Sequence, residues 1–408
     1  SATTSGSNNV AVGRSALQAN TTGHSNVAVG YNAAISVTTG TENVAVGMAA
    51  LDNSDVGSFN TAIGKSALGN DTKGSRNTAV GNSALQTQNF TSATDSYNTA
   101  MGFNAGSAVT TGIQNTIVGG ISGDAITTGD FNTSLGYAAL SATTTADMNT
   151  AIGRTTLQAN TTGANNTAVG GQALQTNTTG ANNTAVGMGA LVQNTEGLRN
   201  SALGFNAGAG VTNGDNNVMI GEAAGNHSVV TTTGIQNTLI GSQTRADSAG
   251  SGQTVAIGYD VAGTGGYTTL GNAGSDIRAL HGNITWATVS DERYKKDIVD
   301  STAGLSFINA LQPRTWKYKT LGELPDTFNA YEADSTEVFK NSETNHGFIA
   351  QEVKAAIDAD DSIKDGFRLW DDRDDGSQEV AEAALIPVLT KAIQELSTQL
   401  DAALARIT

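Results

Sequence analysis

The sequence is dominated by a repeat of seventeen residues. A short motif, Asn-(Thr/Val)-Ala-(Val/Ile)-Gly, recurs along the first two thirds of the chain, and nearly every spacing between its glycines is 17. The motif glycines are Gly13, Gly30, Gly47, Gly64, Gly81, Gly102, Gly119, Gly136, Gly153, Gly170, Gly187, Gly204, Gly221, Gly241 and Gly258. Two spacings are longer, 21 and 20 residues, and indicate insertions of four and three residues in surface loops. One such unit cannot bury its own apolar face, so the units must stack as successive rungs around a shared core.

Each unit predicts a short strand, a turn, a second short apolar stretch such as Ser-Ala-Leu, and a Thr-Thr-Gly turn. Alternation in the strand places Asn and Ala on one face, and Thr and Val on the other. The motif glycine suits a tight corner, and the glycine of Thr-Thr-Gly suits a backbone position with positive φ. A last weak copy, YTTLG, ends at Gly271. Fifteen rungs at the usual spacing of neighbouring strands predict a rod of roughly 70 Å.

Asparagine stands four residues before the motif glycine in fourteen of the fifteen copies, and Thr254 is the exception. A row of asparagines could bind a ligand. The favoured interpretation is a ladder in which each side-chain amide hydrogen-bonds the rungs above and below it. We therefore expect the side chains of Asn166, Asn183 and Asn200 to lie in line.

The repeat resembles the left-handed parallel β-roll of trimeric adhesin heads, found in bacterial autotransporter adhesins and in phage tail fibres. The resemblance covers about 1–271. It implies a homotrimer in which Ala and Val pack across a three-fold axis. The expected fold is therefore mainly β: a trimeric β-roll solenoid, then a small α+β domain that ends in a trimeric helical coiled coil.

Few side chains in the rod indicate chemistry. His24 and His227 are isolated, so no metal site and no cofactor are expected, and surface solvation explains both. Aromatic residues recur directly after the motif glycine. They could stack on sugars, although packing along the flank of the fibre is the favoured interpretation. These residues are Tyr31, Phe103, Tyr137, Phe205 and Tyr259.

Composition divides the chain into two parts. Residues 1–281 contain only 8 of the 21 Lys and Arg residues and 14 of the 37 Asp and Glu residues. The predicted organisation is a repeat fibre over 1–281, a junction over 282–289, a folded domain over 290–384 and a coiled-coil helix over 385–408. A net charge of −16 argues against nucleic-acid and anionic-membrane partners. No apolar run is long enough to span a bilayer.

The last part of the chain has helical periodicity. Leu305, Ile308 and Leu311 predict a helix that ends before Pro313. TWKYK predicts a strand, and HGFIAQEVKAAI predicts a strand or turn that leads into a helix. DDRDDGSQE predicts an exposed loop. After position 385, apolar residues alternate at steps of three and four, which predicts a heptad seam between chains or a helix packed on its own domain. The seam residues are Ile386, Leu389, Ile393, Leu396, Leu400, Ala403 and Ile407.

Four motifs in this region, SDERYKKDI, INALQPRTWKYK, HGFIAQEV and LIPVLTKAIQELSTQLDAAL, occur in order. They resemble the intramolecular chaperone domain of phage endosialidases and related tail fibres, and a similar domain of the myelin regulatory factor. The family trimerises its fibre and then cuts itself off before the motif serine. The resemblance therefore implies cleavage between Val289 and Ser290.

The same resemblance implies roles for the residues around that bond. Ser290 would be the nucleophile and Lys295 the general base, which requires desolvation to lower the pKa of the lysine. Asp291 and Arg293 would support the turn as an ion pair or a hydrogen-bonded frame. Lys296 is interpreted as a solvated neighbour. Without the whole motif, a serine beside lysines would be only a polar surface segment.

The sequence thus predicts a structural fibre of a phage tail, assembled in the host cytoplasm and acting outside the cell. Its expected partners are two further copies of the chain, other tail proteins, and a glycan or protein receptor on the host surface. The only expected enzymatic activity is a single serine/lysine self-cleavage. A bacterial surface adhesin, with a signal peptide and a membrane anchor, is one alternative. A glycan-depolymerising tailspike is another, although no pair of carboxylates in a groove can be recognised.

Overall fold

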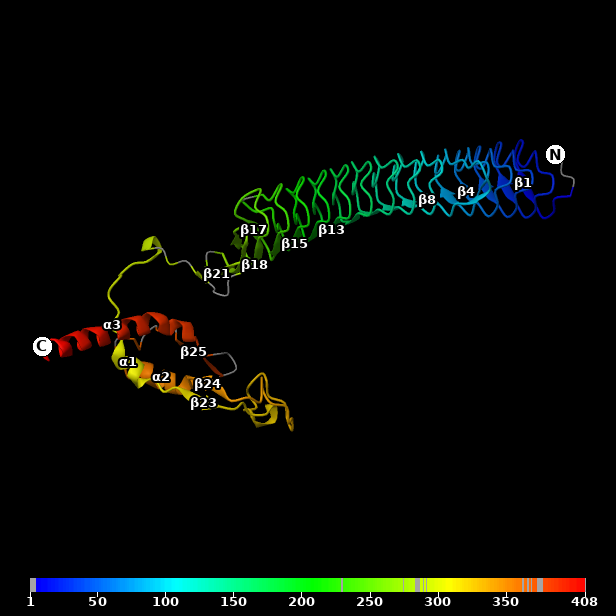
Figure 1. Ribbon diagram of the computed structural model, residues 1–408. Coiled ribbons are helices and arrows are strands. Elements are labelled where there is room, and N and C mark those ends of the chain that lie inside the picture. The colour runs from blue at the N-terminus through cyan, green and yellow to red at the C-terminus, as the bar shows by residue number, and fades with distance from the viewer. Residues whose placement is uncertain are drawn as a thin grey trace. The chain divides into compact units, whose positions relative to one another are not determined.

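The computed structural model has two compact units, residues 1–290 and 291–408. The described residues are 5–407, apart from 229, 274, 283–286, 289, 291, 362, 365–366, 368 and 373–376. Figure 1 shows a solenoid in the first unit and helices with short strands in the second.

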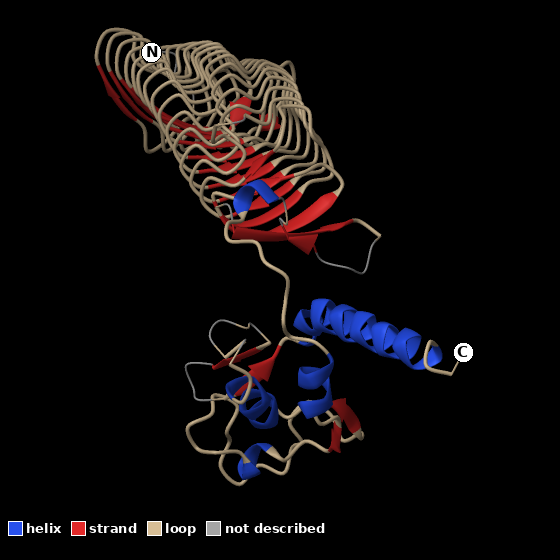
Figure 2. Cartoon of the chain, turned by 90° about the vertical axis from the view of Figure 1, so that its left-hand side faces the viewer, coloured by secondary structure: helices blue, strands red, loops and turns tan. Residues whose placement is uncertain are grey.

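The first unit is a β-solenoid whose rungs each contribute one short strand to a long parallel sheet (Figures 1 and 2). Neighbouring strands pair in register, so that Ala28 lies beside Ala45 and Ala45 beside Ala62. The rungs therefore follow the 17-residue repeat, as predicted. The parallel strands are β1 Val10–Val12, β2 Val27–Val29, β3 Val44–Val46, β4 Thr61–Ile63, β6 Thr78–Val80, β8 Thr99–Met101, β9 Thr116–Val118, β10 Thr133–Leu135, β11 Thr150–Ile152, β12 Thr167–Val169, β13 Thr184–Val186, β14 Ser201–Leu203, β15 Val218–Ile220, β16 Thr238–Ile240, β18 Val255–Tyr259 and β20 Tyr267–Asn272.

The C-terminal end of this sheet changes direction. The weak last copy forms β20, which pairs parallel with β18 on one side. On its other side it pairs antiparallel with β21 (Ser275–Leu280), and β21 then pairs with β22 (Ala287–Thr288). An antiparallel hairpin therefore ends the stack.

The strand alternation is as predicted. In β2, Ala28 is fully buried, whereas Val27 and Val29 on either side are partly exposed. The second apolar stretch also points inward, with Leu51, Leu68 and Leu85 completely buried. The implied packing of Ala across a three-fold axis is therefore wrong, because the Ala column fills the interior of a single chain. Only the Val side of each strand faces outward.

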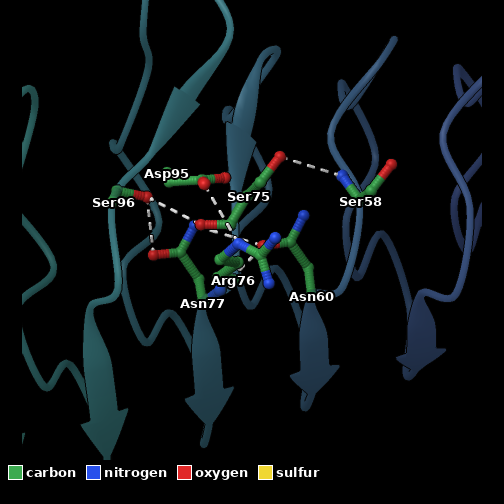
Figure 3. Close-up of polar contacts among 7 residues, drawn as sticks. All are labelled: Ser58, Asn60, Ser75, Arg76, Asn77, Asp95 and Ser96. Atoms are coloured by element: carbon green, nitrogen blue, oxygen red, sulfur yellow. Dashed lines mark hydrogen bonds and ion pairs between the residues drawn. The ribbon is translucent and has the colours of Figure 1, made fainter.

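The asparagine ladder is confirmed along the whole solenoid. The Oδ1 atom of Asn166 accepts the main-chain N–H of Asn183 at 3.0 Å, and that of Asn183 accepts the N–H of Asn200 at 2.9 Å. The Nδ2 atom of Asn183 also donates to Gly197 O at 2.8 Å. Figure 3 shows the same bond between Asn60 and Asn77. Every side chain in the ladder thus satisfies buried backbone groups of the adjoining chain segments.

The two kinds of glycine have different roles. The corner glycine has a φ of 134° at Gly47, a conformation that side chains rarely adopt, and a Cβ there would collide with the carbonyl of Gly64. The glycine of Thr-Thr-Gly does not have a positive φ, so that prediction is wrong. Glycine is needed at Gly40 because the next rung lies close, and a Cβ there would collide with the carbonyl of Gly57.

The four-residue insertion adds a second short parallel pair, β5 (Gly74–Ser75) with β7 (Thr94–Asp95). Near it the interior is polar: Gln88 Nε2 donates to the buried carboxylate of Asp71 at 2.7 Å, and Asn98 Nδ2 donates to Gln88 Oε1 at 2.8 Å. Burial raises the pKa of Asp71. A similar pair, β17 (Arg245–Ala246) with β19 (Ala262–Gly263), lies near the end of the rod.

The second unit is a small α+β fold. Its helices are α1 Leu305–Ala310, α2 Ala350–Asp358 and α3 Leu385–Leu404, with 3₁₀ turns η1 Glu292–Tyr294, η2 Leu321–Glu323 and η3 Glu382–Ala384. Its strands are β23 Arg314–Trp316, β24 Asn345–Gly347, β25 Trp370–Asp372 and β26 Gln378–Val380. The buried residues of its core are Ala303, Phe307, Leu311, Val353, Ile357, Leu369, Leu385 and Val388.

Three details differ from the predictions. The helix before Pro313 buries Phe307, which the spacing argument did not select, whereas Leu305 and Ile308 are only partly buried. The strand predicted from TWKYK is shorter and ends at Trp316. The acidic stretch is not simply a loop, since its two ends form the antiparallel pair of β25 and β26.

Candidate functional site

The predicted cleavage bond lies at the junction of the two units. Strand β22 ends at Thr288, Ser290 is exposed, and η1 begins two residues later. The N–H of Lys295 donates to Glu292 O at 2.9 Å, which closes this turn. The turn η1 thus lies between Ser290 and Lys295 along the chain, and the predicted serine/lysine pair stays a prediction.

The other predicted site residues are only partly placed. Arg293 and Lys295 have exposed side chains in the single chain, as does Lys296. Val289 and Asp291 lie outside the described residues, so their predicted roles stay predictions. The predicted roles of Ser290, Arg293 and Lys295 likewise stay predictions.

Helix α3 has two apolar faces with different environments. Leu385, Val388 and Ala392 are buried, and the first two belong to the core of the second unit. The predicted seam is exposed: Ile386 by 65%, Leu389 by 42%, Ile393 by 66%, Leu396 by 55% and Leu400 by 59%. One face of α3 therefore packs on its own domain, while the residues of the predicted seam do not, so the seam between chains stays a prediction.

A carboxylate fixes α3 to the rest of the unit. Glu395 Oε2 accepts the N–H of Leu305, the first residue of α1, at 2.8 Å. A side chain at Gly304 would meet that carboxylate, which explains the glycine before the helix. Sequence reasoning missed this contact because the two partners are ninety residues apart.

A second fixed pair joins β23 to α2. Arg314 Nε donates to Glu352 Oε2 at 2.9 Å, and its Nη2 donates to Oε1 at 2.7 Å. These hydrogen bonds lower the pKa of Glu352. The two residues belong to the motifs INALQPRTWKYK and HGFIAQEV, so the motifs meet in space and the pair holds them together.

The solenoid contributes a second exposed apolar feature, which we name the aliphatic column. It consists of the residue before each corner glycine, and all fifteen are Val, Ile, Leu or Met. Ile63, Leu135 and Leu203 are 39%, 46% and 50% exposed, and the column follows the outer face of the sheet. Other members, such as Val46 and Val169, are only partly exposed. A partly exposed apolar strip of this length is a candidate interaction surface.

Residues 290–361 match the family of the chaperone of endosialidase. The match begins at the predicted nucleophile and includes both Arg314 and Glu352. No curated protein and no solved structure matches the chain significantly. A chaperone-of-endosialidase region after a solenoid of about fifteen rungs is the arrangement of a structural protein similar to tail fibres and tailspikes.

Two further kinds of site were sought among the described residues. No three of their His, Asp or Glu side chains lie together in a way that could hold a metal ion. None of the described helices has the length and apolar character to cross a membrane.

Proposed function

We propose that the chain forms a homotrimeric phage tail fibre or spike that attaches to the host surface, and that its chaperone region directs trimerisation. The observation that carries this proposal is the exposed heptad face of α3 within a unit that begins with the matched region. Five large aliphatic side chains on one helix would be removed from water if three copies of α3 packed together.

The aliphatic column supports the same assembly along the rod. Since the interior of each rung is already filled by its own Ala and Leu residues, these outward side chains are available to neighbouring chains. The two surfaces have different tasks in the proposal. The column supplies contact area at every rung, whereas α3, which occurs once per chain, aligns the chains.

We also propose that the assembled fibre cuts itself between Val289 and Ser290. The Ser290 hydroxyl oxygen attacks the Val289 carbonyl carbon, while neutral Lys295 takes the hydroxyl proton and passes it to the departing Ser290 nitrogen. The C–N bond breaks and an ester forms. Water then hydrolyses the ester to a Val289 carboxylate and a free Ser290 hydroxyl. Asp291 and Arg293 would hold the turn.

The exposure of Lys295 in the single chain supports coupling of the cut to assembly. A neighbouring chain that covers this turn would exclude water and so favour the neutral lysine. Unassembled chains would then stay uncut. The cut makes the assembly irreversible, because a rod that has lost α3 has lost the element that aligned its chains.

Intact mass spectrometry, combined with molar mass from light scattering, tests this proposal. The wild-type fibre should give a released fragment of residues 290–408 and a trimeric rod, and Ser290→Ala and Lys295→Ala should give uncut trimers. Monomeric wild-type protein would refute the trimer. Cleavage at the normal rate in Lys295→Ala would refute the base, and full-length wild-type trimers after long incubation would refute self-cleavage.

The same proposal implies where the fibre assembles and acts, and which molecules it binds. The fibre would assemble in the host cytoplasm and act outside the cell as part of the virion, joined to other tail proteins. Its receptor would be a glycan or protein of the host surface. The net charge of −16 disfavours binding to nucleic acid.

A further inference from the structure

One exposed column of the solenoid carries an alternation that the repeat does not require. We name it the flank column: the residue five positions before each corner glycine. Along five successive rungs it reads Phe59, Arg76, Tyr97, Gln114 and Phe131. Aromatic and hydrogen-bonding side chains thus alternate rung by rung. Elsewhere the column is mainly polar: Asn8, Ser25, Glu42, Met148, Asn165, Asn182, Arg199, Asn216, Gln236 and Gln253.

The backbone of the flank column makes this choice of residues costly. Every described member has a positive φ, with values of 60° at Phe59, 50° at Tyr97 and 58° at Phe131. Asn tolerates this left-handed conformation best among residues with side chains, and bulky residues are outliers there. Strained positions of this kind concentrate at functional sites. The buried Leu51, Leu68 and Leu85 share this conformation but gain burial in the core, so three exposed aromatic residues need a different explanation.

Burial of the three aromatic side chains does not offset this backbone strain. Phe59 is 44% exposed, Tyr97 is 51% exposed and Phe131 is 48% exposed. Their backbones are nevertheless fixed, since the N–H of Phe59 donates to Thr41 O at 3.0 Å and that of Phe131 donates to Ile113 O at 3.1 Å. The rings are therefore presented to solvent from a rigid support.

Arg76 joins the first two rings into one surface. Its guanidinium carbon lies 4.7 Å from the ring centre of Phe59 and 5.8 Å from that of Tyr97. Its Nε atom lies 3.0 Å from Oδ2 of Asp95, which belongs to strand β7 (Figure 3). The ion pair cancels the charge of the arginine while both groups stay partly exposed. The surface is thus aromatic, rich in hydrogen-bonding groups and without net charge.

We propose that the flank column from Phe59 to Phe131 binds a neutral linear polysaccharide laid along the rod, which deepens and rests on the proposed attachment function. Sugar rings stack their C–H faces on aromatic rings, and their hydroxyls suit Arg76, Asp95 and Gln114. Aromatic residues on alternate rungs lie about 9.6 Å apart, comparable to a disaccharide repeat. The acidic chain would repel an anionic polysaccharide.

Binding of the full-length fibre to an array of neutral hexose and N-acetylhexosamine oligosaccharides of graded length, with sialylated counterparts, tests the proposal. Neutral ligands should bind, and more tightly as they lengthen. Phe59→Asn and Tyr97→Asn should each weaken binding at least tenfold, because each removes a stacking ring. Asn is chosen because it tolerates the positive φ of these positions, so the fold should be preserved. Met188→Asn removes an equally exposed apolar side chain elsewhere and should change nothing.

Three results would overturn the proposal: no binding of any neutral ligand, unchanged binding by Tyr97→Asn, or a preference for the sialylated ligands. A lower melting temperature or a changed molar mass of Tyr97→Asn would also overturn it, by showing that the ring packs against another chain. Adsorption of the labelled fibre to bacterial strains distinguishes a failure of the glycan site from a failure of the proposed attachment function. If Tyr97→Asn adsorbs normally, attachment stands and this site fails. If the wild type does not adsorb but binds glycan through Tyr97, attachment fails and the site stands.

Discussion

The solenoid and the C-terminal unit bury their apolar side chains in different ways. In the solenoid each rung is completed by the next rung of the same chain, with Ala, Leu and Asn side chains fully buried and the ladder bonds unbroken. In the C-terminal unit, α3 buries one face in its own core and leaves a row of Ile and Leu residues exposed. The interior of the solenoid is complete within one chain, whereas the open face of α3 is covered only in the proposed trimer.

This difference explains why a repeat fibre would need a separate aligning domain. Successive rungs are nearly identical, so two chains shifted by one rung would present almost the same aliphatic column to each other. The rod alone therefore specifies its internal stacking but not the alignment between chains. In the proposed trimer, α3 occurs once per chain and would remove that ambiguity.

The strongest test of this contrast is to remove the exposed seam. Changing Leu389, Ile393 and Leu396 together to Ser should cost on the order of 2 kcal/mol of lost burial per residue. We expect monomeric or insoluble chains by light scattering. The double variant Gln394→Ser and Gln399→Ser, which changes exposed polar positions of α3, should stay trimeric. A normal trimer from the triple variant would show that the rod aligns itself.

A single change in the ladder should have a smaller effect, confined to the rod. Asn183→Ala leaves the N–H of Asn200 buried without its partner and removes one of the two side-chain donors to the carbonyl of Gly197, while Asn194 Nδ2 remains. The expected loss is about 1 to 3 kcal/mol per chain, with faster hydrogen exchange in the adjoining rungs. Asn182→Gly changes the exposed neighbour, whose φ is positive, and should be nearly neutral. Equal effects of the two variants would contradict the ladder as the source of stability.

The third largest effect is expected from the loss of the hydrogen bond between α3 and α1. Glu395→Ala removes the acceptor for the N–H of Leu305 and should cost about 1 to 2 kcal/mol, measured as faster hydrogen exchange in α1. Glu395→Gln keeps an acceptor oxygen and should lose less. If α1 exchanges equally fast in both variants, the charge matters and the hydrogen bond does not.

The smallest effect should come from the pair on the surface of the C-terminal unit. Since Arg314 lowers the pKa of Glu352 in the fold, the pair contributes stability above the ordinary pKa of a glutamate, and this contribution is lost as the pH falls through the lowered value. Glu352→Gln should therefore lower the melting temperature slightly at neutral pH and match the wild type in strong acid. The same small deficit at every pH would rule out the pair as its cause.

Much of the solenoid could be predicted because its information is local. A constant spacing of 17 fixes which residues stack, and alternation within three-residue strands fixes which of them face inward. The conformation of the flank column could not be predicted in this way. Phe59 and Asn182 share a positive φ although their residue types suggest opposite preferences, because the hydrogen bonds of the stack impose the backbone shape.

The C-terminal unit was less predictable, since its contacts join distant segments. The heptad spacing of α3 correctly selected the residues that stay exposed, and the motif SDERYKKDI located the region that the family comparison matches. By contrast, nothing in the local sequence pairs Glu395 with Leu305 or Arg314 with Glu352. Those pairs exist only when the helices have packed.

By itself, the sequence determined the repeat, the ladder and the region that matches the chaperone of endosialidase, because each depends on residue spacing or on an ordered motif. Only the tertiary structure decided that Ala fills the interior of one chain, that α3 has one covered and one open face, and that Arg76 lies between two exposed rings. These features depend on which neighbouring side chains already cover each face of a strand or helix. Close packing of the folded chain decides this, and residue spacing alone does not encode it.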